Sequence, residues 1–278
     1  MGKFLTLTKP GIIMGNLITA AAGFAFASKG HFNGILFLIM VVGLGCVIGA
    51  SCVCNNYIDK DLDKMMMRTK KRALAMGTIS GKGALLFAFF LAAVGMTLFS
   101  LFTNFLATSL AALGFCIYVG LYSYGKSRTP YATLIGSVAG ALPPVIGYAV
   151  VSNRLDAGAA FLFLILVFWQ MPHFFAIAMF RLDDYTAAKI PVLPVERGNA
   201  VTKVRMLLYT IAFLIATVFL TTGITYLLVV VPLGIAWILL ACKGFKASDD
   251  QLWARQMFSH SLVAITALSV MITIDSFL

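Results

Sequence analysis

The chain has little charge, and acidic residues are the scarcer kind. Only 11% of its 278 residues are charged, and 10 Asp and Glu stand against 21 Lys and Arg. An ordinary water-soluble domain carries about 25% charged residues, so this composition excludes that class. With 61% apolar residues and a mean hydropathy of +0.97, the sequence predicts an integral membrane protein.

Cysteine and histidine are also scarce. The cysteines all lie in apolar runs, where a buried thiol behaves as a small hydrophobe, so no disulfide framework is expected. Cys52 and Cys54 are two residues apart and would face different directions on a helix, which argues against a metal pair. Nothing in the sequence resembles a nucleophilic triad. The five cysteines are Cys46, Cys52, Cys54, Cys116 and Cys242.

Long apolar runs fill most of the chain. They far exceed the roughly ten-residue alternating strands of a membrane barrel, and backbone groups in lipid must be satisfied internally, so the runs are helices. The sequence predicts an all-α polytopic protein with nine transmembrane helices, forming a single intramembrane domain over residues 1–278. The expected spans are 11–28, 34–56, 83–101, 104–122, 131–151, 157–180, 207–222, 225–242 and 258–277, with a kink at Pro143-Pro144.

The positive charge lies on one side of this predicted bundle. Of the 21 Lys and Arg, 19 fall in alternate connections, and only Lys29 and Arg154 fall on the other side. This is the positive-inside pattern, so we expect the N-terminus and the charged loops to be cytoplasmic. It explains the basic pI through anionic lipid of the bilayer, and no nucleic-acid partner is expected. Without an Arg-rich amphipathic leader, the bacterial cytoplasmic (inner) membrane is favoured.

A polar stripe ends the second span. Asn55, Asp59 and Asp63 are spaced four residues apart and share one helix face, whereas Asp61 would point the other way. Two carboxylates one turn apart suit Mg²⁺, which completes its coordination with water and phosphate oxygens. The alternative interpretation is a solvated loop of mixed charge.

Two long charged loops follow the second and sixth spans. If they meet, the carboxylates could hold magnesium while the cations neutralise a diphosphate leaving group. The alternative is that each basic residue only enforces topology or contacts lipid head groups. The candidate residues beyond the stripe are Arg68, Lys71, Arg72, Lys126 and Arg128, with Asp184, Tyr185 and Lys189 in the second loop.

His173 lies inside an apolar helix, one residue after a proline that frees a backbone carbonyl. It is either a core histidine that satisfies such a carbonyl, or an axial ligand or porphyrin contact. His31 in an outer loop and His260 at the start of the last span are expected to be interfacial, with His260 as a reserve ligand candidate.

Several stretches together resemble one family. NNYIDKDLD followed by RTKKRAL resembles the first acidic motif, Asn-x-x-x-Asp-x-x-x-Asp, of the UbiA-type intramembrane prenyltransferase superfamily. Within it, the chain is similar to the branch that farnesylates protohaem IX, and this likeness runs from the first span to the last. The stretches that carry it are YSYGKSRTP, GALPPVIGY, WQMPHFFAIAMFRLDDY and KIPVLPV.

The resemblance implies nine helices around a central, laterally open cavity and a Mg²⁺-dependent reaction. A farnesyl group would pass from farnesyl diphosphate to a vinyl group of haem B, giving haem O and diphosphate, with a downstream haem A or oxidase assembly partner possible. Haem B is then a substrate, not a prosthetic group. The implied site comprises Asn55, Asp59 and Asp63 for the metal, Asp184 and Lys189 in the second motif, and Arg68, Lys71, Arg72, Tyr122, Lys126, Arg128, His173 and Tyr185 for the substrates.

The second acidic motif departs from the wider superfamily. Asp183 and Asp184 are followed by Ala187, Ala188 and Lys189 where a further Asp is usual, so the number of Mg²⁺ ions stays open. Lys189 could instead contact the diphosphate. Two alternatives also remain: prenylation of an aromatic quinone precursor, and a secondary transporter, against which the charges cluster at one face and not at the midplane.

Overall fold

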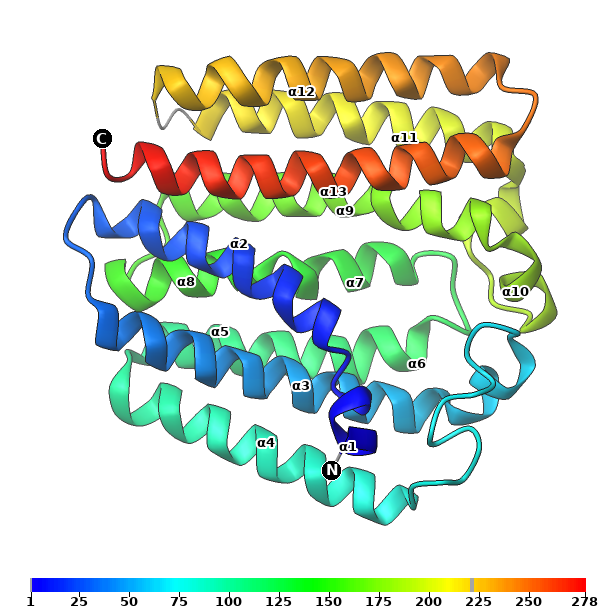
Figure 1. Cartoon of the computed structure of the whole chain (residues 1–278), viewed down its shortest axis with the longest axis horizontal. Helices are drawn as coiled ribbons and strands as arrows, with labels where there is room; N and C mark the ends of the chain where they lie inside the picture. The colour runs from blue at the N-terminus through cyan, green and yellow to red at the C-terminus, as the bar shows by residue number, and fades with distance from the viewer. Residues whose placement is uncertain (1, 221–222) are drawn as a thin grey trace.

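The computed structural model describes residues 2–220 and 223–278, and in this part of the chain all regular structure is helical (Figure 1). Nine helical segments there are long and apolar enough to cross a membrane, which confirms the predicted fold class. They are α2 (Pro10–Ser28), α3 (Gly34–Met65), α4 (Gly81–Phe102), α5 to α6 (Phe105–Gly125), α7 with α8 (Ala132–Gly140, Leu142–Ser152), α9 (Ala157–Phe180), α11 (Leu193–Leu220), α12 (Ile224–Lys243) and α13 (Asp250–Asp275).

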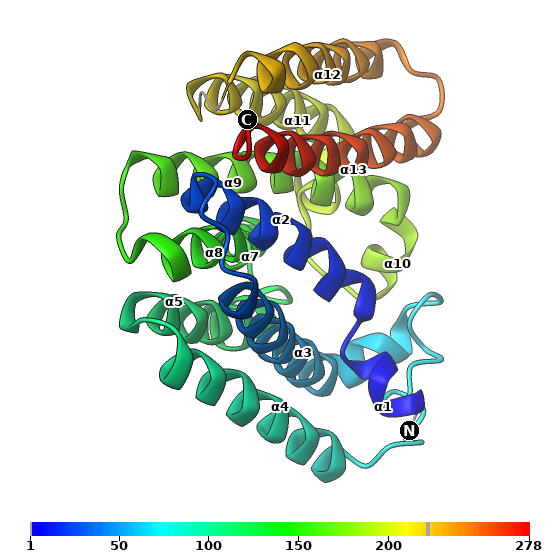
Figure 2. The ribbon, with the colours of Figure 1, turned by 60° about the vertical axis from the view of Figure 1, so that its left-hand side comes forward.

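The spans lie side by side, and their long connections gather at one end of the bundle. Helix α3 packs on α4, α2 packs on α8, and α9 packs on α11 and α13. The 66–80 connection and the short helix α10 (Leu182–Ala187) lie together on the right of Figure 1, and Figure 2 shows the same end turned. We call this end, with residues 126–131 and 244–249, the charged face.

Glycines set the closest helix crossing, between α2 and α8. A methyl group on Gly23 would lie 2.0 Å from the Pro144 carbonyl oxygen, and one on Gly147 would lie 2.0 Å from the Ala20 carbonyl oxygen. Small residues let two backbones approach this closely in a membrane. The crossing fixes the N-terminal helix against the centre of the bundle.

Two irregular segments shape the middle of the molecule. The helix breaks at Ala141, between α7 and α8, which confirms the kink expected at Pro143-Pro144. A π-helix, η1 (Ile117–Tyr122), interrupts the fourth span just before Ser123. Such π segments are rare and frequently mark functional sites.

Three helices extend beyond the apolar spans expected from the sequence, because their charged ends are also helical. Helix α3 runs to Met65 and α13 begins at Asp250, while α11 begins at Leu193 and is kinked at Gly198, whose backbone is not helical (φ 76°, ψ 168°). Helices α11 and α13 are joined beyond their apolar stretches by an ion pair between Lys203 Nζ and Asp250 Oδ1, at 2.5 Å. The expected end of the seventh span at residue 222 lies outside the described residues.

Candidate active site

The acidic stripe of α3 faces inward. Asn55, Asp59 and Asp63 are only 2–3% exposed, whereas Asp61 is exposed and pairs with Lys64 at 2.7 Å. Helix α3 has 32 residues, about 48 Å at 1.5 Å per residue, against about 30 Å of hydrocarbon, so its polar end reaches the charged face. The predicted stripe and the outward direction of Asp61 are both confirmed, and the solvated-loop alternative is wrong.

Cations from two other segments meet the two carboxylates. Lys126, after the fourth span, forms an ion pair with Asp59 Oδ2. Arg72, in the 66–80 connection, donates from Nη1 to both oxygens of Asp63 at 2.9 and 3.0 Å. Buried carboxylates require such partners, because an unpaired charge out of water costs several kcal/mol.

Lys9 completes the cluster, and nothing in the sequence beyond its charge points to it. Its backbone adopts a left-handed conformation (φ 53°) between α1 (Gly2–Leu7) and α2, and its ammonium donates to Asn55 Oδ1 at 2.6 Å. Burial lowers the pKa of Lys9 from its ordinary 10.5 to about 8. The Asn55 amide in turn donates to Ser123 Oγ at 3.0 Å, so Ser123 is a second residue missed from the sequence.

The two long charged loops meet at the charged face, as the hypothesis required. Asp184 Oδ1 accepts from the Met67 backbone N–H at 2.9 Å, and Met66 packs against Ala188 and Ile190. Tyr185 borders that contact, and burial raises the pKa of its phenol, opposed by the charge of Arg68. Asp184 and its neighbours in the second loop therefore contact the start of the 66–80 connection, which also carries Arg72.

The remaining predicted substrate residues are less enclosed. Arg68, Lys71, Arg128 and Lys189 are exposed. Tyr122 is half-buried: its ring lies 5.2 Å from that of Tyr118 and packs over Gly136, where a methyl group would meet it at 2.8 Å.

His173 lies in the contact between α9 and α13. Its Nδ1 is 2.7 Å from Ser261 Oγ, and its ring stacks on Trp169 with centroids 4.7 Å apart. Ser261 is the one hydrogen-bond partner of this ring within residues 2–220 and 223–278, so no freed carbonyl satisfies it. His260 differs, because its Nε2 is 3.0 Å from the Leu233 carbonyl oxygen and its ring stacks on Trp237.

The donor set of the stripe suits magnesium. Asp59 Oδ1 is buried and accepts no hydrogen bond from the described residues, which leaves one carboxylate oxygen available to an ion. No cluster of three His, Cys, Asp or Glu side chains able to hold a metal occurs in the described part of the chain. Mg²⁺ bound with a phosphate ester needs only one or two carboxylates. Asp59 has an oxygen free to supply one, whereas the oxygens of Asp63 and Asn55 are held by Arg72 and Lys9.

The fold and this site define an intramembrane prenyltransferase. The model of the UbiA prenyltransferase family matches residues 16–263, and the chain belongs to that family. The transporter alternative is therefore rejected, because this is a family of prenyltransferase enzymes.

Two curated relatives of this chain share one name. A protoheme IX farnesyltransferase of Protochlamydia amoebophila is 51% identical over 276 residues, covering 98% of each chain. One of Yersinia pseudotuberculosis is 50% identical over 278 residues, covering 98% of this chain and 94% of the relative.

Solved structures share the fold at low identity. A digeranylgeranylglyceryl phosphate synthase has a TM-score of 0.81 at 17% identity, covering 99% of this chain and 98% of that one. A UbiA homologue from Archaeoglobus fulgidus, bound to GPP and Mg²⁺, has a TM-score of 0.72 at 17% identity, covering 98% and 99%.

Proposed function

We propose that this chain transfers the farnesyl group of farnesyl diphosphate to a vinyl group of haem B, giving haem O and diphosphate. The observation that carries the proposal is the buried stripe Asn55, Asp59 and Asp63, enclosed by three cations at one end of a membrane bundle. Relatives about 50% identical over almost the whole chain, named for this reaction, supply the acceptor.

The stripe residues would hold Mg²⁺, whose charge would neutralise the diphosphate as its bond to farnesyl breaks. Lys9, Lys126 and Arg72 contact the same three side chains, so they lie where a diphosphate on those residues would need counter-charge. Positioned cations of this kind stabilise charge that develops on a leaving group. Asp184 Oδ1 accepts from the Met67 backbone N–H, so the proposal assigns the metal to the stripe of α3.

The proposed reaction needs no strong protein base, because the vinyl group itself is the nucleophile that attacks C1 of farnesyl. The diphosphate leaves with the electron pair of the C–O bond, and the terminal vinyl carbon bonds to C1 of farnesyl. Water adds its hydroxyl to the other vinyl carbon and releases one proton. The protein's task is to position both substrates and to limit water, which would otherwise capture the allylic cation.

For haem B we propose a contact at His173. Ser261 holds Nδ1, which fixes the ring plane and directs Nε2 as the nitrogen for a ligand. A second-shell hydrogen bond commonly orients a ligating histidine in this way. The expected central, laterally open cavity would lie between this residue and the stripe.

The test is purified protein in detergent with haem B, farnesyl diphosphate and Mg²⁺, followed by chromatography of the haems. Formation of haem O and diphosphate in equal amounts supports the proposal. Farnesylation of a hydroxybenzoate or naphthoate with haem B unchanged would favour the quinone-precursor alternative instead. A chelator should stop the reaction, and added Mg²⁺ should restore it.

The same proposal places the charged face in the bacterial cytoplasm, at the inner membrane, where a soluble diphosphate leaves into water. Support comes from the charge distribution, since 19 of the 21 Lys and Arg fall on that side of the predicted spans. The product would pass to a haem A enzyme or an oxidase assembly partner.

A further inference from the structure

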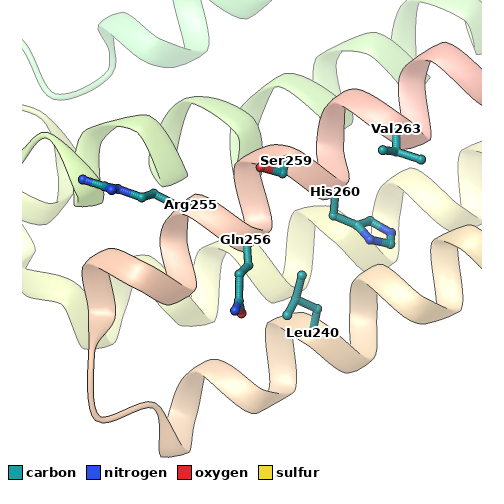
Figure 3. A pocket seen from close by; sticks show the side chains of 6 residues that line it. All are labelled: Leu240, Arg255, Gln256, Ser259, His260 and Val263. Carbon is teal, nitrogen blue, oxygen red and sulfur yellow. The ribbon is translucent and has the colours of Figure 1, made fainter.

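A shallow groove of about 420 Å³ runs between α12 and α13, away from the acidic stripe. Its lining is Leu240 from α12 and Arg255, Gln256, Ser259, His260 and Val263 from α13. Figure 3 shows Gln256 and His260 pointing from α13 towards α12, with Leu240 between them, while Arg255 leaves α13 on the side away from α12, where its guanidinium lies over the Phe180 ring. Four of the six lining residues are therefore polar on a membrane-spanning helix.

Polar side chains on the outer surface of a span are costly unless something covers them. Arg255, Gln256 and Ser259 are exposed, although they belong to a helix that crosses the membrane. In the described part of the chain Arg255 forms no ion pair, and its contact there is with the Phe180 ring, 6.0 Å from the guanidinium carbon. The guanidinium donors are thus available to an outside acceptor.

The depth of Arg255 matches the lipid head groups. Helix α13 has 26 residues, about 39 Å, against about 30 Å of hydrocarbon, so its first turns lie in the interfacial layer. Arg255 lies in the second turn from Asp250, and Lys243 and Lys246 are exposed at the neighbouring end of α12. Ser259 and His260 follow one turn deeper, and Val263 and Leu240 continue the groove with apolar surface.

We propose that this groove binds one anionic phospholipid of the leaflet at the charged face. The phosphate accepts from the Arg255 guanidinium, the glycerol and ester oxygens lie against Gln256 and Ser259, and an acyl chain follows Leu240 and Val263. Basic sites between helices at the charged side of a membrane protein bind anionic head groups on this principle. The proposal is independent of the farnesyl transfer chemistry.

The experiment is native mass spectrometry of the full chain in detergent, with phosphatidylglycerol and phosphatidylcholine of identical acyl chains. The wild type should retain phosphatidylglycerol at least fivefold more than phosphatidylcholine, and Arg255→Gln should lose that preference. The matched control is Lys82→Gln, which removes an exposed cation from the start of α4 and should keep the preference. A second variant, Val263→Trp, fills the groove without changing charge and should lower binding of both lipids.

Equal retention of the two lipids by the wild type, or equal losses in Lys82→Gln and Arg255→Gln, would overturn the proposal. Displacement of the lipid by equimolar glycerol phosphate would also overturn it, since a site for the free anion needs no acyl chain. Should Arg255→Gln fail to fold, Val263→Trp decides: unchanged retention of phosphatidylglycerol in that variant rejects the groove.

Discussion

At the residue scale, the candidate site consists of buried polar and acidic side chains, each in contact with a cation. Each member of the stripe has a named partner: Lys9 for Asn55, Lys126 for Asp59 and Arg72 for Asp63. Because the three partners come from three different connections, the cluster also joins the chain's N-terminal segment to α3 and to the loop after the fourth span. These contacts therefore hold separate segments together, and the same cations are the ones proposed to neutralise the diphosphate.

Asp59→Asn should lower turnover at least about a hundredfold, the size of effect that follows loss of one positioned electrostatic group. The amide keeps the shape but removes the charge that faces Lys126 and would face Mg²⁺. Haem O formation by purified enzyme is the measurement. Asp61→Asn is the matched control on the same helix, and its turnover should be unchanged because Asp61 is exposed.

Lys9→Gln should raise the KM for farnesyl diphosphate about tenfold, equivalent to about 1.4 kcal/mol of binding. Glutamine can still donate to Asn55 but supplies no positive charge beside the diphosphate. Initial rates against farnesyl diphosphate concentration give the KM. Lys82→Gln controls for the loss of a cation at the same face, and an equal rise in both variants would reject a specific role for Lys9.

His173→Ala should weaken haem B binding and leave binding of farnesyl diphosphate almost unchanged, because the ring lies on α9 against α13 and not beside the stripe. The measurement is the absorption spectrum of added haem B. His31→Ala, an exposed outer-loop change, should leave that spectrum as in the wild type. An unaltered spectrum in His173→Ala would contradict the contact.

At the element scale, small residues and helix breaks allow the helices to approach one another closely. The α2–α8 crossing depends on Gly23 and Gly147, which allow backbone to meet backbone. The π-helix before Ser123 brings that hydroxyl to Asn55. The irregular helix therefore places Ser123 of the fourth span within hydrogen-bond distance of Asn55 on α3.

Gly23→Ala should destabilise the fold by about 1–3 kcal/mol, the usual cost of overpacking a tight contact. Its new methyl group would lie 2.0 Å from a carbonyl oxygen of the backbone, which cannot move aside as a flexible side chain does. Thermal unfolding in detergent, followed by circular dichroism, measures the change. Gly15→Ala on the same helix meets no atom within 4 Å and should be neutral or slightly stabilising.

At the scale of the whole molecule, an odd number of spans in the described residues places the segment before α2 and the segment after α13 at opposite ends of the bundle. The two long loops lie at one end, so the proposed reaction would release diphosphate on one side of the membrane. The opposite end carries short connections, in which Asp156 caps α9 by accepting from Gly158 and Ala159.

Cysteine labelling tests this orientation. In a background without the five native cysteines, Lys70→Cys should react with a membrane-impermeant thiol reagent only after the cells are opened. Arg154→Cys, in the connection on the opposite face, should react in intact cells, because both residues are exposed at their own ends of the bundle. The reverse pattern would contradict the cytoplasmic placement of the charged face.

The sequence by itself determined the class, the nine spans, the charged face and the inward stripe. These follow from the length of apolar runs and from four-residue spacing, both properties of single helices. Only the tertiary structure showed that Lys9 and Ser123 reach Asn55, that Asp184 binds the backbone at Met67, and that His173 rests on Ser261. Periodicity specifies which side of a helix a residue occupies, but its partner depends on how separate helices pack, which no single stretch encodes.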